Sequence, residues 1–218
     1  MHFKGVFHSL GYLTQAAGVT IAVSLAGIAL GFILGAMVCM ARLSGYPGLS
    51  RAGAVYVSIF RGVPLLVLLL FIYYFLGKFG IEVPALVAAI GGLGLSSGAY
   101  QAEILRGALN AVPRGQSEAA TAFGFMPFDI WRRVLLPQAL RISVPPFINE
   151  FILLLKASSL VSVVGIAELT RVSMNIASST YRPLEAYIAG GLFYLATNLC
   201  LAGFGGVTER WLGMGRRA

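Results

Sequence analysis

Apolar runs of membrane-spanning length recur along this chain of 218 residues, with short polar stretches between them. A helix needs about 20 consecutive apolar residues to cross a bilayer, because each residue adds about 1.5 Å to its length. We therefore predict an all-α integral membrane protein with five transmembrane helices. The predicted spans cover residues 14–41, 52–76, 84–108, 134–155 and 186–208.

Two smaller features of the same pattern refine this prediction. The apolar run at 157–167 has 11 residues, which suits an interfacial or re-entrant piece better than a span. In the first span, Gly27, Gly31 and Gly35 follow one another at intervals of four. Small residues at that spacing allow a second helix to approach closely, although the spacing alone does not identify that helix.

Composition supports a membrane protein with a single transmembrane domain, residues 1–218. The chain is 58% hydrophobic and 11% charged, whereas soluble domains have roughly 25% charged residues. The net charge of +8 raises the question of nucleic-acid binding. Its arginines are spread along loops and are not clustered with aromatic residues, which argues against nucleic acid and leaves lipid as the expected surroundings.

The distribution of Lys and Arg predicts the orientation. With five spans the two termini lie on opposite sides of the membrane. One set of loops carries ten Lys and Arg residues, and the other carries five. The positive-inside rule therefore predicts an outer N-terminus and a cytoplasmic C-terminus.

One polar segment interrupts the apolar chain, because residues 101–141 hold eight of the 24 charged residues. We predict two short helices here, joined by a tight turn. Ser117 is the expected N-cap of the first helix, and Gly124 ends it in a left-handed conformation. Pro127 begins the second helix, and Pro137 breaks it before the fourth span.

Two interpretations of this polar segment remain open from its periodicity. In the second short helix Phe128 and Trp131 fall near one face, and Arg132 and Arg133 fall on the other. An amphipathic helix resting on lipid headgroups has this pattern and is favoured by periodicity alone. The other interpretation is a knob that enters a groove on a soluble partner.

Charged residues within the spans are candidate functional residues, because charge at membrane depth is costly. Arg61 lies within the second span, and Glu103 lies near the inner end of the third. We expect them to form an ion pair or part of a gate, with a direct ligand contact as the less favoured alternative.

The fourth span is the best candidate to line a substrate path. Its two consecutive prolines, Pro145 and Pro146, remove backbone donors ahead of Asn149 and Glu150. Distorted helices at membrane depth are tolerated where they line a water-filled cavity. In the alternative interpretation Asn149 caps freed backbone groups and Glu150 pairs with Lys156. The further candidates for the path are polar residues of the third span: Ser96, Ser97 and Tyr100.

Several kinds of site are not predicted. The chain has no G-x-x-x-x-G-K-[ST] sequence, so we expect no nucleotide bound in the P-loop manner. Its only histidines are His2 and His8, and no Cys or carboxylate cluster accompanies them. We therefore predict neither a metal site nor catalytic residues.

Three blocks of sequence resemble a known family, the permease subunits of ABC importers. The blocks are FRGVPLLVLLLFIYYFL at 60–76, GAYQAEILRGALNAVPRGQSEAA at 98–120, and the stretch from GQSEAATAFGF through VLLPQALRISVPPFINEFILLLKASSLVSVVGIAEL. More narrowly, the chain is similar to the polar amino acid (histidine/glutamine-type) family. The opening YLTQAAGVTIAVSLAGIALG fits more loosely, and the resemblance covers nearly the whole chain.

The resemblance assigns a role to the polar segment. In that family the EAA motif forms a cytoplasmic coupling helix pair that inserts into a cleft on an ATPase, and we call residues 113–133 the EAA segment. The positions that match the family's motif are Gly115, Glu118, Ala119, Ala120, Gly124 and Pro137. The family's usual KDTSL appears here as KASSL at 156–160, so a role for an acidic group at Ala157 is not expected.

The resemblance also implies partners. They are a cytoplasmic ABC ATPase dimer carrying ATP and Mg²⁺, a second permease subunit that is identical or homologous, and a periplasmic or extracellular amino acid-binding protein. This chain itself would bind no cofactor. We therefore expect a transmembrane permease subunit that imports polar amino acids across a bacterial plasma (inner) membrane. Basic amino acids would be favoured if Glu150 is ionised and faces the path. The competing hypotheses are a partner-gated channel or scaffold and, more distantly, a membrane enzyme.

Overall fold

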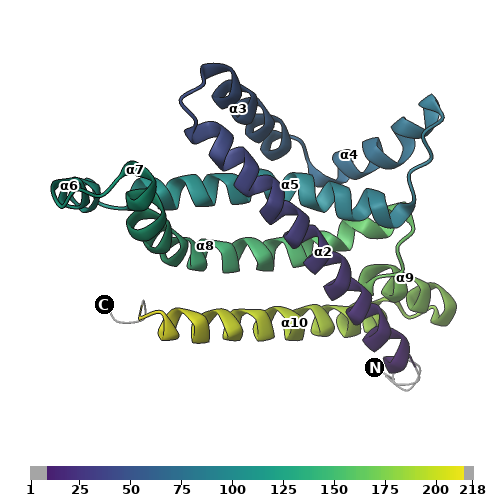
Figure 1. Cartoon of the computed structure of the whole chain (residues 1–218). Helices are drawn as coiled ribbons and strands as arrows, with labels where there is room; N and C mark the ends of the chain where they lie inside the picture. The colour runs from purple at the N-terminus through teal and green to yellow at the C-terminus, as the bar shows by residue number, and fades with distance from the viewer. Residues whose placement is uncertain (1–8, 214–218) are drawn as a thin grey trace.

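Helices make up the whole architecture of the described chain, as the sequence predicted (Figure 1). A computed structural model describes residues 9–213, so His2, Lys4, His8, Arg216 and Arg217 lie outside the described residues. No strand occurs within that range. The α-helices are α2 (Leu10–Leu43), α3 (Pro47–Gly62), α4 (Leu65–Leu70), α5 (Ala85–Ala111), α6 (Arg114–Ala122), α7 (Pro127–Asp129), α8 (Leu136–Ala157), α9 (Leu169–Thr180) and α10 (Pro183–Trp211).

Four short segments complete the helical path. Two are π-helical turns, η1 (Phe71–Phe75) and η3 (Ile130–Leu135), and two are 3₁₀ helices, η2 (Leu76–Phe79) and η4 (Ser158–Val164). In Figure 1, α2 crosses α5 and α8 diagonally, and α10 runs below α8. The helices α6 and α7 lie at the same end of the body as the end of α10, whereas α9 and the start of α2 lie at the opposite end.

The second predicted span is wrong as a single straight helix. Among the described helices, α2, the path Pro127–Val164 and α10 are each long and apolar enough to cross a membrane. The residues expected at 52–76 instead form α3 and the α4–η2 segment, which meet at an angle of 103° and would count as a fourth span only if taken together. The break falls at Val63, whose backbone is extended because Pro64 follows it. The third predicted span coincides with α5, which carries Gln101, Glu103 and Arg106 in its second half and is not among the helices that qualify by length and hydropathy.

The glycine seam of α2 packs against α5, which identifies the helix that the sequence left open. A Cβ atom added at Gly31 would lie 2.9 Å from Gln101 Nε2, and one at Gly35 would lie 2.9 Å from Gln101 Cβ and 3.0 Å from the Gly98 carbonyl oxygen. Contacts this short leave no room for a side chain. The two helices therefore approach closely because α2 has no Cβ along this face.

The short apolar run at 157–167 is partly buried in the helical body, with Val163, Gly165 and Ala167 exposed. It forms η4, in which Ser158 and Val161 are fully buried. Val161 and Val164 join a core cluster with Leu69, Leu93 and other apolar side chains of α2 and α8. Irregular backbone at membrane depth is tolerated only where protein surrounds it or where it lines a cavity, and η4 satisfies the first condition.

Pro137 does not break the helix before α8, contrary to the sequence prediction. The helical path continues from Pro127 through η3 into α8, and Pro137 occupies the first turn of α8. The first turn of a helix tolerates a missing N–H, and the π-turn that precedes it bonds each N–H to a carbonyl five residues back. Further along, α8 also continues through Pro145 and Pro146.

Candidate functional site

The EAA segment projects from one end of the helical body and forms two short helices around a turn (Figure 1). The first helix begins at Arg114, four residues before the start that the sequence predicted, with Pro113 at the N-cap position. Ser117 therefore lies inside α6, and its hydroxyl donates to the Arg114 carbonyl oxygen at 2.8 Å. Proline suits this place because its fixed φ matches the start of a helix and it needs no backbone acceptor.

The turn of the EAA segment depends on Gly124, as predicted. Gly124 has a φ of +79°, in the left-handed region that glycine adopts without steric cost. Its N–H donates to the Thr121 carbonyl oxygen at 2.9 Å, and the Phe125 N–H donates to the Ala120 carbonyl oxygen at 3.1 Å. These two bonds satisfy carbonyl groups that the end of α6 would otherwise leave free. Pro127 then begins α7, also as predicted.

The EAA segment exposes large apolar side chains although its composition is polar. Phe123 is 84% exposed, Met126 is 69% exposed and Phe128 is 67% exposed, and Trp131 is also exposed. Gly115, Glu118 and Ala119 are exposed, whereas Ala120 is buried. Clustered apolar exposure beside polar groups marks a surface for another molecule. The sequence pattern indicated Phe128 and Trp131, but Phe123 and Met126 emerge only from the folded turn.

The base of the EAA segment is packed rigidly onto the body. Ala108 and Val112 at the end of α5 form a buried cluster with Ala139 at the start of α8, and Leu135 of η3 packs against it. The segment is thus bracketed by α5 and α8. Close packing at this point connects the segment directly to these two helices.

Further along α5 and α8, a buried hydrogen-bonded chain joins the two helices. Glu150 is 8% exposed, and its Oε1 accepts a hydrogen bond of 2.9 Å from the Ser97 hydroxyl. Gln101 lies one turn after Ser97 and is fully buried. Its Nε2 donates to Ser97 Oγ at 2.9 Å and to the Ile28 carbonyl oxygen of α2 at 3.3 Å.

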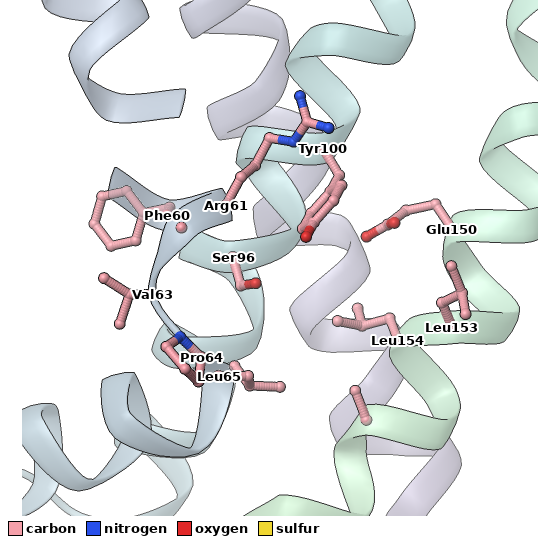
Figure 2. A pocket seen from close by; sticks show the side chains of 12 residues that line it. Phe60, Arg61, Val63, Pro64, Leu65, Ser96, Tyr100, Glu150, Leu153 and Leu154 are labelled. Atoms are coloured by element: carbon pink, nitrogen blue, oxygen red, sulfur yellow. The ribbon is translucent and has the colours of Figure 1, made fainter. Parts of the chain in front are cut away.

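A cavity of about 500 Å³ opens beside this chain of hydrogen bonds, between the α3–α4 bend, α5 and α8 (Figure 2). Its polar wall consists of Arg61, Ser96, Tyr100 and Glu150. Figure 2 shows the Glu150 carboxylate pointing from α8 toward Tyr100 on α5. The Arg61 guanidinium lies over the Tyr100 ring, 5.0 Å from its centroid, which is within the range of a cation–π contact.

Three of the five candidate residues for the substrate path line the cavity, and two do not. Ser96, Tyr100 and Glu150 line it. Ser97 does not line it, but its hydroxyl donates a hydrogen bond to Glu150. Asn149 is exposed and does not line this cavity, because its place next to Glu150 turns it away by about 100° around the helix. The alternative Glu150–Lys156 pair is not formed among the described residues, since the Glu150 carboxylate bonds to Ser97 instead.

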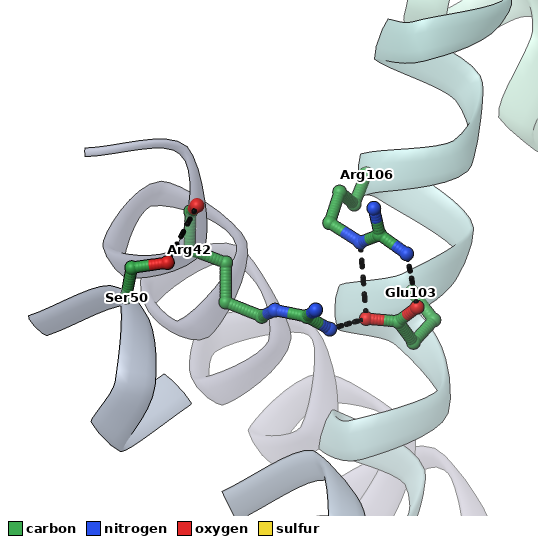
Figure 3. Close-up of polar contacts among 4 residues, drawn as sticks. All are labelled: Arg42, Ser50, Glu103 and Arg106. Carbon is green, nitrogen blue, oxygen red and sulfur yellow. Dashed lines mark hydrogen bonds and ion pairs between the residues drawn. The ribbon is translucent and has the colours of Figure 1, made fainter. Parts of the chain in front are cut away.

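The predicted ion pair between Arg61 and Glu103 is wrong. Glu103 binds Arg42 of α2 and Arg106 of its own helix (Figure 3). Arg106 Nη2 donates to Glu103 Oε2 at 2.7 Å, and Arg106 Nε donates to Oε1 at 3.2 Å. The reason is proximity: Arg106 is one turn away on α5, and α2 brings Arg42 alongside. Arg61 remains over Tyr100 at the cavity.

A second buried carboxyl group was not foreseen. Glu168 is fully buried at the start of α9, where its oxygens accept from the N–H groups of Thr170 at 2.8 Å and Arg171 at 2.7 Å. The Tyr194 hydroxyl of α10 also donates to it at 2.6 Å. An acidic residue directly before a helix is a recognised capping signal, which would have identified the first role of Glu168 but not its contact with α10.

Comparison with known proteins places these features in a family. The family model described as "Binding-protein-dependent transport system inner membrane component" matches residues 27–213. The octopine transport system permease protein OccM of Rhizobium meliloti is 37% identical over 213 residues, which cover 93% of this chain and 87% of that protein. The glutamine transport system permease protein GlnP of Escherichia coli strain K12 is 34% identical over 202 residues, 92% of each chain.

A solved structure agrees with this placement over nearly the whole fold. The crystal structure of an amino acid ABC transporter with histidines superposes with a TM-score of 0.92 at 34% sequence identity, over 96% of this chain and 98% of that one. The sequence family and the three-dimensional arrangement thus point the same way. The chain belongs to the family of binding-protein-dependent transport system inner membrane components.

Proposed function

We propose that this chain is the membrane-spanning permease subunit of an ABC importer that moves polar amino acids across a bacterial inner membrane. The names of its relatives, which include a glutamine permease and an octopine permease, support this class of cargo. The similar solved structure is likewise that of an amino acid transporter. The chain is a non-catalytic component, and the ATP and Mg²⁺ of the transport cycle bind to a separate ATPase.

The single observation that carries the proposal is the connection between the EAA segment and the cavity. The segment exposes Phe123 and Phe128 for a partner, and its base is packed between α5 and α8. The same two helices carry Tyr100 and Glu150 on opposite walls of the cavity. An ATPase that docks on the segment and moves it would therefore displace the walls of the cavity, which is the step that import requires.

This arrangement supports our proposal for the partners and the orientation. The ATPases act as a dimer, so a second permease subunit, identical or homologous, supplies the other docking segment. The segment and the end of α10 lie at one end of the body, and the excess of Lys and Arg in these loops supports a cytoplasmic position for that end. An amino acid-binding protein delivers cargo at the opposite, outer end, near α9 and the start of α2.

The cavity suits an amino acid because its walls carry both signs of charge. Arg61 is a cation that can face an α-carboxylate, and Glu150 is a carboxylate that can face an ammonium or guanidinium group. A volume of about 500 Å³ is within the usual range for small-ligand sites. We propose that Glu150 contacts the cationic side chain of a basic amino acid, as the sequence suggested.

Uptake into vesicles that contain this chain, its ATPase, its second permease subunit and its binding protein tests the function. Labelled glutamine, arginine and histidine should enter only with ATP. Flux that persists without the ATPase would support the alternative of a partner-gated channel, and an absence of any flux would support a scaffold.

A substitution at Glu150 tests the cargo. Glu150→Gln should reduce the uptake of arginine more than that of glutamine, and an equal reduction of both would assign Glu150 to the α-ammonium group. The matched control is Glu185→Gln, because Glu185 lies in the first turn of α10 and does not line this cavity.

A further inference from the structure

Gln101 is the least expected residue of the buried chain of hydrogen bonds, because it makes no contact with the cavity itself. It is fully buried between α2 and α5, and it does not line the cavity beside Glu150. The glycine seam holds it tightly, since a Cβ at Gly31 would lie 2.9 Å from its Nε2 and 3.1 Å from Ser97 Cβ. The position of its amide group is therefore fixed by the packing of α2 against α5.

The orientation of the Gln101 amide follows from its partners. The Ile28 backbone carbonyl can only accept a hydrogen bond, so the atom 3.3 Å from it must be the amide nitrogen. That nitrogen carries two hydrogens, and the second points at Ser97 Oγ, 2.9 Å away. The reverse orientation would place two acceptors against each other. Ile28 thus determines which way Gln101 faces.

This orientation decides where the Ser97 proton goes. Ser97 Oγ accepts from Gln101, so the single hydrogen of the hydroxyl is free to be donated to Glu150 Oε1 at 2.9 Å. Among the described residues this is the one side-chain hydrogen bond of Glu150. The other carboxylate oxygen, Oε2, is therefore left for whatever occupies the cavity.

The unpartnered carbonyl oxygen of the amide indicates that the polar group of Gln101 does not serve to stabilise the fold. Gln101 Oε1 is buried and has no hydrogen-bond partner among the described residues. Burying a polar atom without a partner costs free energy of folding, and an apolar side chain of the same shape would avoid that cost. A residue retained only for packing would be better replaced by methionine.

We infer that Gln101 is a positioning residue for the cargo cavity: acting through Ser97, it orients Glu150 so that one carboxylate oxygen is held and the other faces the cargo. This inference rests on the proposed function, because it assumes that Glu150 contacts the transported amino acid. It adds a residue outside the cavity that determines how the cavity binds.

The test is a double-substitution cycle in the reconstituted transporter, with whichever of labelled glutamine, arginine and histidine is transported best. Gln101→Met should raise the apparent KM about three- to tenfold, as expected for the loss of one hydrogen bond between uncharged groups. It should leave the maximal rate unchanged, and the unfolding temperature should be unchanged or higher. Ser97→Ala should raise KM by a similar factor. Because Gln101 acts through Ser97, the double variant should be no worse than Ser97→Ala alone.

Two further variants separate positioning from structure. Ser143→Ala is the matched control for Ser97→Ala, because Ser143 is an equally buried serine of α8 whose hydroxyl bonds only to the Leu140 carbonyl oxygen. It should leave KM unchanged. Gln101→Leu also removes both amide hydrogens without adding an atom to the glycine seam. It should raise KM in the same direction, which keeps the test available if Gln101→Met does not assemble.

Two outcomes would overturn the inference: an unchanged KM in Gln101→Met, whether or not its unfolding temperature falls, or additive effects in the double variant. Each differs from a failure of the proposed function, which would show as a wild-type complex that takes up none of the three amino acids with ATP.

Discussion

Replacing Gly124 with alanine changes the turn of the EAA segment and nothing around it. An added Cβ would find no atom within 4 Å, so the substitution causes no clash with neighbouring side chains. The cost comes from the backbone alone, because φ is +79° at this residue. For an L-amino acid such as alanine, the left-handed conformation is less favourable by roughly 1–2 kcal/mol.

That cost sets the expected size of the effect. If the ATPase binds only the native conformation of the turn, with residue 124 left-handed, a penalty of roughly 1–2 kcal/mol weakens binding by about 5- to 30-fold. Gly124→Asn should weaken it less, since Asn tolerates the left-handed region better than alanine does. The affinity of the ATPase for the permease in lipid nanodiscs measures this directly, and ATP-dependent uptake should fall in the same order.

The control is Gly107→Ala, because Gly107 lies within α5, also has no neighbour within 4 Å, and has no positive φ. It should leave the affinity unchanged. Equal affinities for the wild type and Gly124→Ala would refute the reasoning, and so would an equal loss in Gly124→Ala and Gly107→Ala.

Further predictions concern the packing and the buried polar groups, and each is checked by unfolding the purified permease in detergent. Gly35→Ala should destabilise it by about 1–3 kcal/mol, because the new Cβ would lie 3.0 Å from backbone that cannot yield, whereas Gly18→Ala in the same helix has open space and should gain up to about 1 kcal/mol. Tyr194→Phe removes a donor from buried Glu168 and should cost about 1–2 kcal/mol, with no loss expected if the 2.6 Å contact is absent. Glu103→Gln should cost about 1–2 kcal/mol, since it leaves two partly buried arginines without their carboxylate, and an unchanged stability would contradict the contacts seen here.

Features that depend on local backbone chemistry could be predicted from the sequence. The left-handed Gly124 and the helix start at Pro127 follow from single residues whose conformational preferences are strong. The glycine spacing of α2 also predicted correctly that another helix packs closely against this face. It did not reveal α5 as the partner, because periodicity describes one face of a helix and not what lies opposite.

Features that depend on contacts between distant residues could not be predicted. Glu103 was assigned to Arg61, but Arg42, 61 positions away in the chain, reaches it because α2 crosses α5. The bend at Val63 had a local signal in the following proline, and the strong hydropathy of residues 52–76 obscured it. Gln101 gave no signal at all, since an uncharged amide in an apolar helix becomes meaningful only beside Ser97 and Ile28.

The unbroken course of α8 has a mechanical consequence. Leu136 and Glu150 stand 14 residues apart on this helix, so they are roughly 20 Å apart along its axis. A rotation of only about 10° about the Leu136 end would then swing Glu150 through roughly 4 Å, which exceeds the length of a hydrogen bond. A small displacement at the Leu136 end would therefore be enough to separate the Glu150 carboxylate from the Ser97 hydroxyl.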